Sequence, residues 1–221
     1  MIWNLPKALR DGTPSLVLSS ALAVLLLLAR IAATHERDYT FLAWNLFLAW
    51  VPYGLSMAIR GLHARRAHAA VLVTLFAAWI GFLPNAPYLV TDFMHLRYRD
   101  GAPLWFDAVM LASFAWAGVG LGVSSLRLCA RVVRVRGGER MASGFVALAA
   151  LLTGFGIYLG RFVRLNTWDV ATRPVTVLRQ VLSPLAHPLA HPRAWTVTLT
   201  FALFFLVAYA AGRRATSLQQ T

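Results

Sequence analysis

The sequence contains few of the charged residues that cover the surface of a soluble protein. Only 13% of its 221 residues are charged, whereas 59% are hydrophobic, and the mean hydropathy is +0.62. Soluble domains carry about 25% charged residues, so this composition excludes an ordinary soluble domain. Several apolar runs approach or exceed the roughly 20 residues that a helix needs to cross a bilayer. The chain is therefore predicted to be a multi-pass membrane protein.

Cysteine and the familiar catalytic motifs are almost absent. Cys129 is the only cysteine, so the chain forms neither an intramolecular disulfide nor a thiolate metal site. No nucleophile motif, phosphate-binding loop or dinucleotide fingerprint occurs in the sequence. The sequence consequently assigns no metal and no cofactor, and it leaves open whether the protein is an enzyme.

Acidic residues are also scarce, with eight Asp and Glu against 21 Lys and Arg, which gives a formal net charge of +13. Such an excess of positive charge can indicate a nucleic-acid partner. Here the basic residues fall in short runs between apolar spans, where membrane topology explains them. We therefore expect the lipid bilayer, and no nucleic acid, as their partner.

The apolar runs predict an all-α fold, a polytopic helix bundle of about six spans in one integral membrane domain, 1–221. The spans are expected at about 15–33, 39–59, 69–90, 104–126, 141–160 and 195–211. The third has a clean apolar run only from Ala69 to Leu83, which reaches about 22 Å across a core about 30 Å thick. A short interfacial or re-entrant helix is expected to follow it.

The distribution of Lys and Arg predicts the orientation, because cytoplasmic loops are rich in both. The termini and the second and fourth loops carry 12 basic and two acidic residues, whereas the opposite side carries nine and six. Both termini are therefore predicted to be cytoplasmic. The segments 84–103 and 161–194 are expected on the extracytoplasmic side.

The segment "FLPNAPYLVTDFMHL" gathers polar residues on that side. Pro84 is expected to end span three, and Asn85 to act as the N-cap of the short helix that follows. On that helix Tyr88, Asp92 and His95 would share a face at the i, i+4, i+7 spacing. The opposite, apolar face would consist of Leu89, Phe93 and Leu96.

Asp92 and His95 admit three interpretations. They form an acid–base pair or contact a substrate, they ligate a metal ion, or they belong to an ordinary helix end at which Asp92 pairs with an arginine. Two ligands are too few for a metal site, so no metal is assigned. The pairing predicted for Asp92 is with Arg161 or Arg164, the opposite charges expected at the same depth.

The segment "GIYLGRFVRLNTWD" carries the second polar group. Glycines before it, such as Gly154, would allow close helix packing. Arg161 and Arg164 share a face where the helix leaves the membrane, and such a pair can bind a phosphate or carboxylate, or else reach to lipid headgroups. Asn166 and Asp169 follow, and they favour a polar site over a simple lipid anchor.

Two further segments carry isolated polar residues. In "WNLFLAWVPYG", Asn45 and Pro52 are expected to interrupt span two, with Asn45 hydrogen-bonded to another helix. Residues 175–182 are predicted to form a short amphipathic surface helix. "AHPLAHP" places His187 and His191 four residues apart, but the prolines disturb the helix that a shared metal would need.

Four motifs resemble those of the bacterial membrane family listed as domain of unknown function 1361. They are "WNLFLAWVPYG", "FLPNAPYLVTDFMHL", "WFDAVMLASFAWAG" and "GIYLGRFVRLNTWD". The resemblance covers roughly residues 40 to 210, with the motifs in the same order. It implies a multi-pass protein of the bacterial plasma (inner) membrane. It implies no activity, substrate or cofactor.

Three functions remain open at this point. The leading hypothesis is a membrane-embedded enzyme that acts on an anionic or lipid-linked substrate, with Asp92 or His95 moving protons. The alternatives are a scaffold of envelope assembly, whose polar cluster is structural, and a transporter component. Under the enzyme hypothesis one outward-facing cavity is lined by Asn85, Asp92, His95, Arg161, Arg164, Asn166 and Asp169, and substrate contacts come from these residues together with Asn45 and Tyr88.

Overall fold

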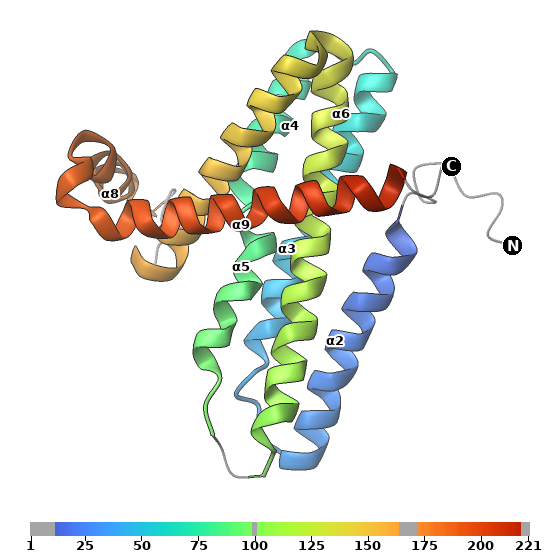
Figure 1. The fold of residues 1–221 in the computed structure, drawn as a ribbon, viewed down its shortest axis with the longest axis vertical. Coiled ribbons are helices and arrows are strands. Elements are labelled where there is room, and N and C mark those ends of the chain that lie inside the picture. Colours follow the sequence, from blue (N-terminus) through green and yellow to red (C-terminus); the bar gives the residue numbers. More distant parts are fainter. Residues whose placement is uncertain (1–11, 99–100, 164–171, 218–221) are drawn as a thin grey trace, which may run out of the picture. The chain divides into compact units, whose positions relative to one another are not determined.

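The computed structural model describes residues 12–98, 101–163 and 172–217. These described residues form helices and no strands, which confirms the all-α prediction. Five of their helices are long and apolar enough to cross a membrane. The elements are α2 (Thr13–Thr34), α3 (Phe41–Ala64), α4 (Ala69–Phe82), α5 (Asn85–Tyr88), η1 (Leu89–His95), α6 (Leu104–Tyr158), η2 (Leu159–Val163), α8 (Pro174–Ala186), η3 (Pro188–Ala190) and α9 (Pro192–Ser217) (Figure 1).

The chain divides into two compact units, Met1–Val132 (unit 1) and Val133–Thr221 (unit 2). The helix α6 contains both the fourth and the fifth predicted spans. Between them, the residues predicted as a loop at 127–140 are helical except around Gly138, where φ is 75° and ψ is −176°. Glycine adopts this backbone conformation without a steric penalty. The two predicted spans are therefore separated by a kink at Gly138 and not by a long loop.

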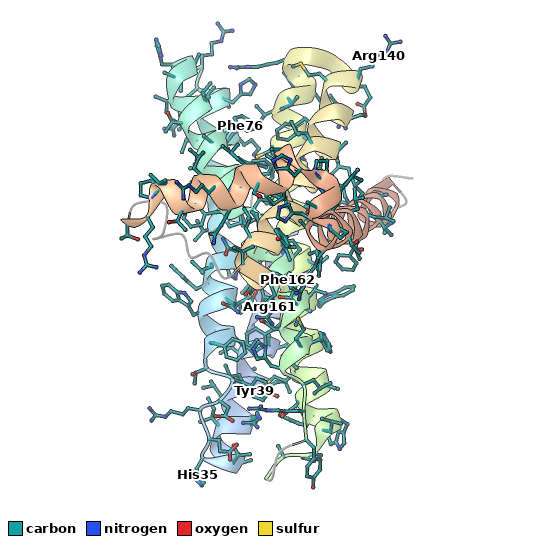
Figure 2. All side chains as sticks on the ribbon, turned by 90° about the vertical axis from the view of Figure 1, so that its left-hand side faces the viewer. His35, Tyr39, Phe76, Arg140, Arg161 and Phe162 are labelled. Atoms are coloured by element: carbon teal, nitrogen blue, oxygen red, sulfur yellow. The ribbon has the colours of Figure 1, made fainter. Side chains whose placement is uncertain are left out.

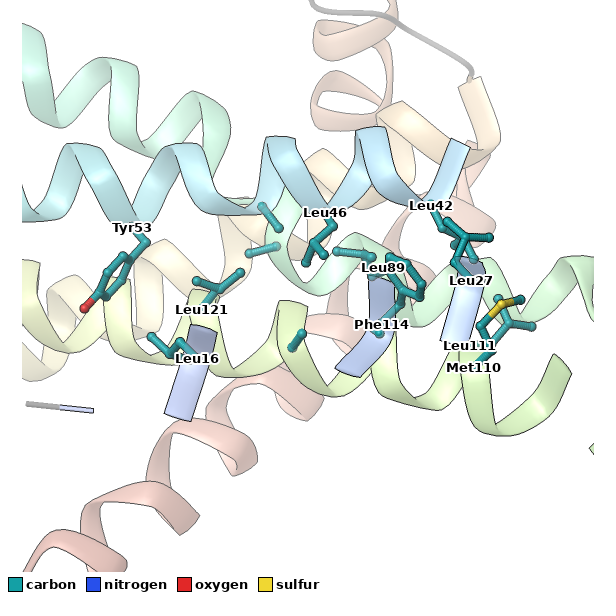
Figure 3. Close-up of a cluster of buried hydrophobic side chains, with 14 of the residues drawn as sticks. Leu16, Leu27, Leu42, Leu46, Tyr53, Leu89, Met110, Leu111, Phe114 and Leu121 are labelled. Carbon is teal, nitrogen blue, oxygen red and sulfur yellow. The ribbon is translucent and has the colours of Figure 1, made fainter. Parts of the chain in front are cut away.

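The core of unit 1 is built from the inward faces of α2, α3, α6 and the short helices between α4 and α6. Figure 3 shows Leu16 and Leu27 of α2 facing the side chains of α3 and α6. On the opposite face of α2, Leu18, Leu22 and Leu25 are exposed by 53% to 70%. A helix with an apolar core face and an equally apolar outer face is typical of a membrane span. The other core residues are Ala23, Tyr39, Leu42, Leu46, Ala49, Tyr53, Ala86, Leu89, Met110, Leu111, Phe114, Ala117, Leu121 and Leu128.

The helix α6 approaches α5 closely at Gly118. A Cβ atom at this position would lie 2.3 Å from the carbonyl oxygen of Ala86 and 2.7 Å from Cδ1 of Leu89. Only glycine permits this backbone approach, in the way that small residues do between membrane helices. The contact holds the polar segment that follows α5 against the bundle of unit 1.

The third crossing does not stop at Pro84. The backbone of Pro84 is helical, with φ −57° and ψ −28°, so α4, α5 and η1 follow one another in a run from Ala69 to His95. This run of 27 residues is long enough to cross a bilayer. The predicted N-cap at Asn85 is wrong, since Pro84 occupies the cap position and Asn85 Nδ2 instead donates to the carbonyl of Phe82 at 3.0 Å.

The predicted interruption of span two is also wrong, because α3 continues through Pro52. The side chain of Ser125 in α6 donates to the carbonyl of Pro52 at 2.9 Å, and it accepts a hydrogen bond from Trp79 Nε1 of α4 at 2.7 Å. This link joins three helices of unit 1 at one buried point.

In unit 2, α6 packs against α9 at Gly154, as the sequence predicted. A Cβ atom there would lie 2.2 Å from the carbonyl oxygen of Thr198. The predicted surface helix at 175–182 is present as α8, Pro174–Ala186, and it carries a stripe of exposed apolar side chains. The three-residue helix η3 connects it to α9.

Candidate functional site

A buried ion pair joins α2 to α6 in unit 1. Arg30 Nε donates to Asp107 Oδ1 at 2.7 Å, and each of the two side chains is exposed by 1% or less. Glu36 adds a second carboxylate, with its Oε2 3.7 Å from Nη2 of Arg30. An arginine near the end of an apolar helix would be costly without such partners. Sequence reasoning missed this pair, although an arginine inside "LLLLARIAAT" was an available signal.

Tyr39 connects this ion pair to His95. The guanidinium carbon of Arg30 lies 4.6 Å from the centre of the Tyr39 ring, within the range of a cation–π interaction. The Tyr39 hydroxyl donates to the carbonyl oxygen of His95 at 3.1 Å. Tyr39 lies near His35 at the end of unit 1 where α2 gives way to α3 (Figure 2). The ends of α2, α3, η1 and α6 are thus tied together by polar contacts.

Asn45 and Asp92, two of the predicted site residues, are in direct contact. Asn45 Nδ2 donates to Asp92 Oδ2 at 3.0 Å, across 47 residues of sequence. Asp92 is fully buried, and Asn45 is half-buried. The prediction that Asn45 hydrogen-bonds to another helix is confirmed. A carboxylate in this apolar environment is stabilised by the amide donor, because an unpaired buried charge would cost several kcal/mol.

The imidazole of His95 is half-buried beside this pair. Its Nδ1 lies 3.3 Å from the backbone carbonyl of Asp92, and its ring centre lies 4.9 Å from that of Phe41. A carbonyl oxygen can only accept, so Nδ1 carries the proton in this contact. The two contacts hold the imidazole ring in one orientation.

The shared face predicted for this segment is only partly correct. Residues 89–95 form a 3-10 helix, in which side chains three residues apart are aligned. Leu89 therefore lies on the same side as Asp92, and both are fully buried, whereas Phe93 is exposed by 38%. The sequence prediction placed Leu89 on the opposite face, because it assumed 3.6 residues per turn.

The remaining predicted residues are distributed differently. Asn85 is half-buried and bonded to the backbone of Phe82, and Tyr88 is half-buried three residues before Thr91, whose hydroxyl donates to the Tyr88 carbonyl. Arg161 lies next to Phe162 on η2, in unit 2 (Figure 2). Three residues lie outside the described residues, namely Arg164, Asn166 and Asp169. The pairing of Asp92 with an arginine and the common cavity both stay predictions.

The chemistry available in unit 1 is acid–base chemistry. Within the described ranges, no group of three or more His, Cys, Asp or Glu side chains is arranged to hold a metal ion. The Asp92 carboxylate contacts an amide, and His95 contacts a carbonyl oxygen. Each is held in one orientation by a neighbour, as groups that move protons require. Cys129 is buried.

Comparison with known proteins identifies one matching family. No curated protein sequence and no solved structure matches it. A family model described as "Protein of unknown function (DUF1361)" matches residues 44–208, a range that includes Asn45, Asp92 and His95. This range is most of the chain and contains all four motifs on which the resemblance rested. The protein belongs to the family of unknown function DUF1361.

Proposed function

We propose that this protein acts on an anionic or lipid-linked substrate at the extracytoplasmic surface of the plasma membrane, through Asp92 and His95. The observation that carries the proposal is the contact between Asn45 and Asp92 beside His95. An amide, a carboxylate and an imidazole meet there within a largely apolar bundle, and ionisable residues inside membrane helices commonly mark functional sites. Asn45 orients the carboxylate, and His95 exchanges the proton.

The cationic part of the substrate site is assigned to Arg161 and Arg164. Their spacing on the sequence allows both guanidinium groups to contact one phosphate or carboxylate, which arginine binds in a bidentate manner. Asn85, Tyr88, Asn166 and Asp169 complete the set of proposed substrate contacts. The extracytoplasmic placement rests on the unequal distribution of basic residues between the loops.

A structural role is the second candidate, and a specific observation favours it. Asp92 and Asp107 are almost completely buried, and each accepts a hydrogen bond from a neighbouring helix. A protein whose polar residues hold helices together would serve as a scaffold of the envelope. The two candidates predict different responses to the loss of charge at Asp92.

The test returns variants to a deletion strain of the native host and measures both membrane abundance and rescue of the deletion phenotype. Asp92→Asn keeps the shape of the side chain but removes the carboxylate, and His95→Gln removes the imidazole ring. We expect both to retain normal abundance and to lose rescue. Glu139→Gln, at an exposed residue, is the matched control and should rescue fully.

Asp107→Asn provides the structural comparison, because its carboxylate pairs with Arg30. Its abundance and its rescue should fall together. If Asp92→Asn and His95→Gln behave in the same way as Asp107→Asn, the cluster is structural and the enzymatic proposal is wrong. Labelling of a Tyr98→Cys variant in intact cells tests the orientation, since Tyr98 is 78% exposed and Cys129 is buried.

A further inference from the structure

Unit 2 contains a pocket that is separate from the residues of the proposed function. It encloses about 310 Å³ between the end of α6, α8 and the residue that precedes α9. This volume is at the lower end of the range for small-molecule sites, about 300 to 1,000 Å³. The lining residues are Tyr158, Val163, Arg179, Gln180, Ser183, Pro184 and His191.

One face of α8 supplies the polar side of this pocket. Arg179 and Gln180 are adjacent in the sequence, and Ser183 follows them by four and three residues. The three side chains therefore lie within about one turn of the helix surface. Ser183 Oγ lies 2.9 Å from Nε2 of His191, which holds both groups at the pocket wall. The backbone carbonyl of Pro184 is fixed by Trp195 Nε1 at 3.1 Å.

Two features of the lining define the chemistry of a ligand. Among the described residues, the lining includes a cation, Arg179, and no acidic residue, so it favours an anionic group. Arg193 adds a second cation nearby, with its guanidinium carbon 4.6 Å from the ring centre of Phe162, the neighbour of Val163. The side-chain oxygen of Gln180 is buried and has no hydrogen-bond partner among the described residues. A ligand with a hydrogen-bond donor beside its anionic group would satisfy it.

The neighbouring face of α8 indicates where such a ligand comes from. Val175, Leu178, Leu182 and Leu185 follow the spacing of one helical stripe and are exposed by 49% to 62%. The apolar run of α9, which is long enough to cross a membrane, begins at Pro192, six residues after α8 ends. Because the connection is so short, α8 lies at the membrane surface. A helix with an exposed apolar stripe at that position inserts the stripe among lipid chains.

We propose that the pocket of unit 2 binds the headgroup of an anionic membrane phospholipid that carries hydroxyl groups next to its phosphodiester. Arg179 contacts the phosphate, Gln180 accepts from a headgroup hydroxyl, and the Ser183–His191 pair adds hydrogen bonds. Tyr158, Val163 and Pro184 contact the apolar part of the lipid. The pocket shares no residue with the proposed function, so the two proposals can be tested separately.

The experiment measures thermal unfolding of the full chain in a zwitterionic detergent while one compound is added. The compounds are dioctanoyl phosphatidylglycerol, dioctanoyl phosphatidylcholine and glycerol phosphate. The first has an anionic headgroup with hydroxyls, the second is neutral and has no donor, and the third lacks the chains. We expect phosphatidylglycerol to raise Tm in a saturable way, and the other two to require at least tenfold higher concentrations.

Variants assign the effect to the pocket. Arg179→Gln should weaken the apparent affinity for phosphatidylglycerol at least tenfold, and Arg179→Lys should lose less because it keeps the charge. Arg136→Gln removes an exposed charge from α6 and is the matched control, with unchanged affinity. If Arg179→Gln unfolds, Ser183→Ala serves as the second pocket variant. Equal responses to phosphatidylcholine or glycerol phosphate, or an unchanged response in both pocket variants, would overturn the proposal.

Discussion

Arg30 in unit 1 is buried against Asp107, whereas Arg179 in unit 2 is an exposed residue beside a pocket whose described lining residues include no acidic side chain. The difference follows from solvation. A guanidinium that leaves water needs a carboxylate nearby, and the pair then fixes the two helices that carry it. A guanidinium at the membrane surface keeps its hydration and remains available to an anionic ligand. The buried Arg30–Asp107 pair therefore stabilises the fold, whereas Arg179 beside the pocket is the cation proposed to bind a ligand.

Asp92 in unit 1 shares features of both cases. It is buried like Asp107, yet the donor in its contact with Asn45 is a neutral amide. An amide compensates a carboxylate less completely than a guanidinium does. The contact that holds Asp92 therefore differs in kind from the one that holds Asp107.

The largest effect should come from breaking the ion pair of unit 1. Asp107→Ala leaves Arg30 buried without its closest carboxylate, which should lower the free energy of unfolding by about 3 to 5 kcal/mol. Denaturant unfolding of the purified protein in detergent measures this loss. The double replacement of Arg30 by Met and Asp107 by Leu should recover much of it, because an apolar pair removes both desolvation penalties. A double variant as unstable as Asp107→Ala would contradict this account.

Replacing the glycine at either of the two close helix contacts, one in each unit, should have an intermediate effect on stability. Gly118→Ala and Gly154→Ala each place a Cβ within 2.3 Å of a backbone carbonyl oxygen, that of Ala86 or that of Thr198. Each should cost about 1 to 3 kcal/mol, because the helices must move apart. Gly144→Ala is the control, since no atom lies within 4 Å of the added Cβ. If thermal unfolding gives the same Tm for Gly144→Ala as for Gly118→Ala and Gly154→Ala, the packing at these two contacts is loose.

The smallest effect on stability should occur in the pocket of unit 2. Ser183→Ala removes the contact with His191 at a half-buried position, and a hydrogen bond of this kind contributes about 0.5 to 1.5 kcal/mol. The Tm without lipid should therefore change little, while the stabilisation by phosphatidylglycerol decreases. A large loss of Tm without lipid would show that the pair serves the fold, as the ion pair of unit 1 does.

Several features of the fold could be predicted from local sequence alone. The spans follow from runs of apolar residues, the surface helix α8 from its periodic apolar stripe, and the close approach at Gly154 from a small residue within an apolar run. The errors at Pro52 and Asn85 share one cause. Local propensity predicts that proline interrupts a helix, but α3 and the run from Ala69 to His95 both continue through a proline because packing against other helices holds them in place.

The sequence by itself determined that this chain is a helical membrane protein and which of its residues are unusually polar for one. The tertiary structure decided how those residues combine. Arg30 and Asp107 are 77 residues apart, and Asn45 and Asp92 are 47 apart, so the sequence spacing carries no information about either pair. The 3-10 geometry of 89–95 and the turn that brings His191 to Ser183 likewise depend on packing against other helices. Periodicity reports which side of a helix is apolar, whereas a contact between two polar groups depends on where both helices lie.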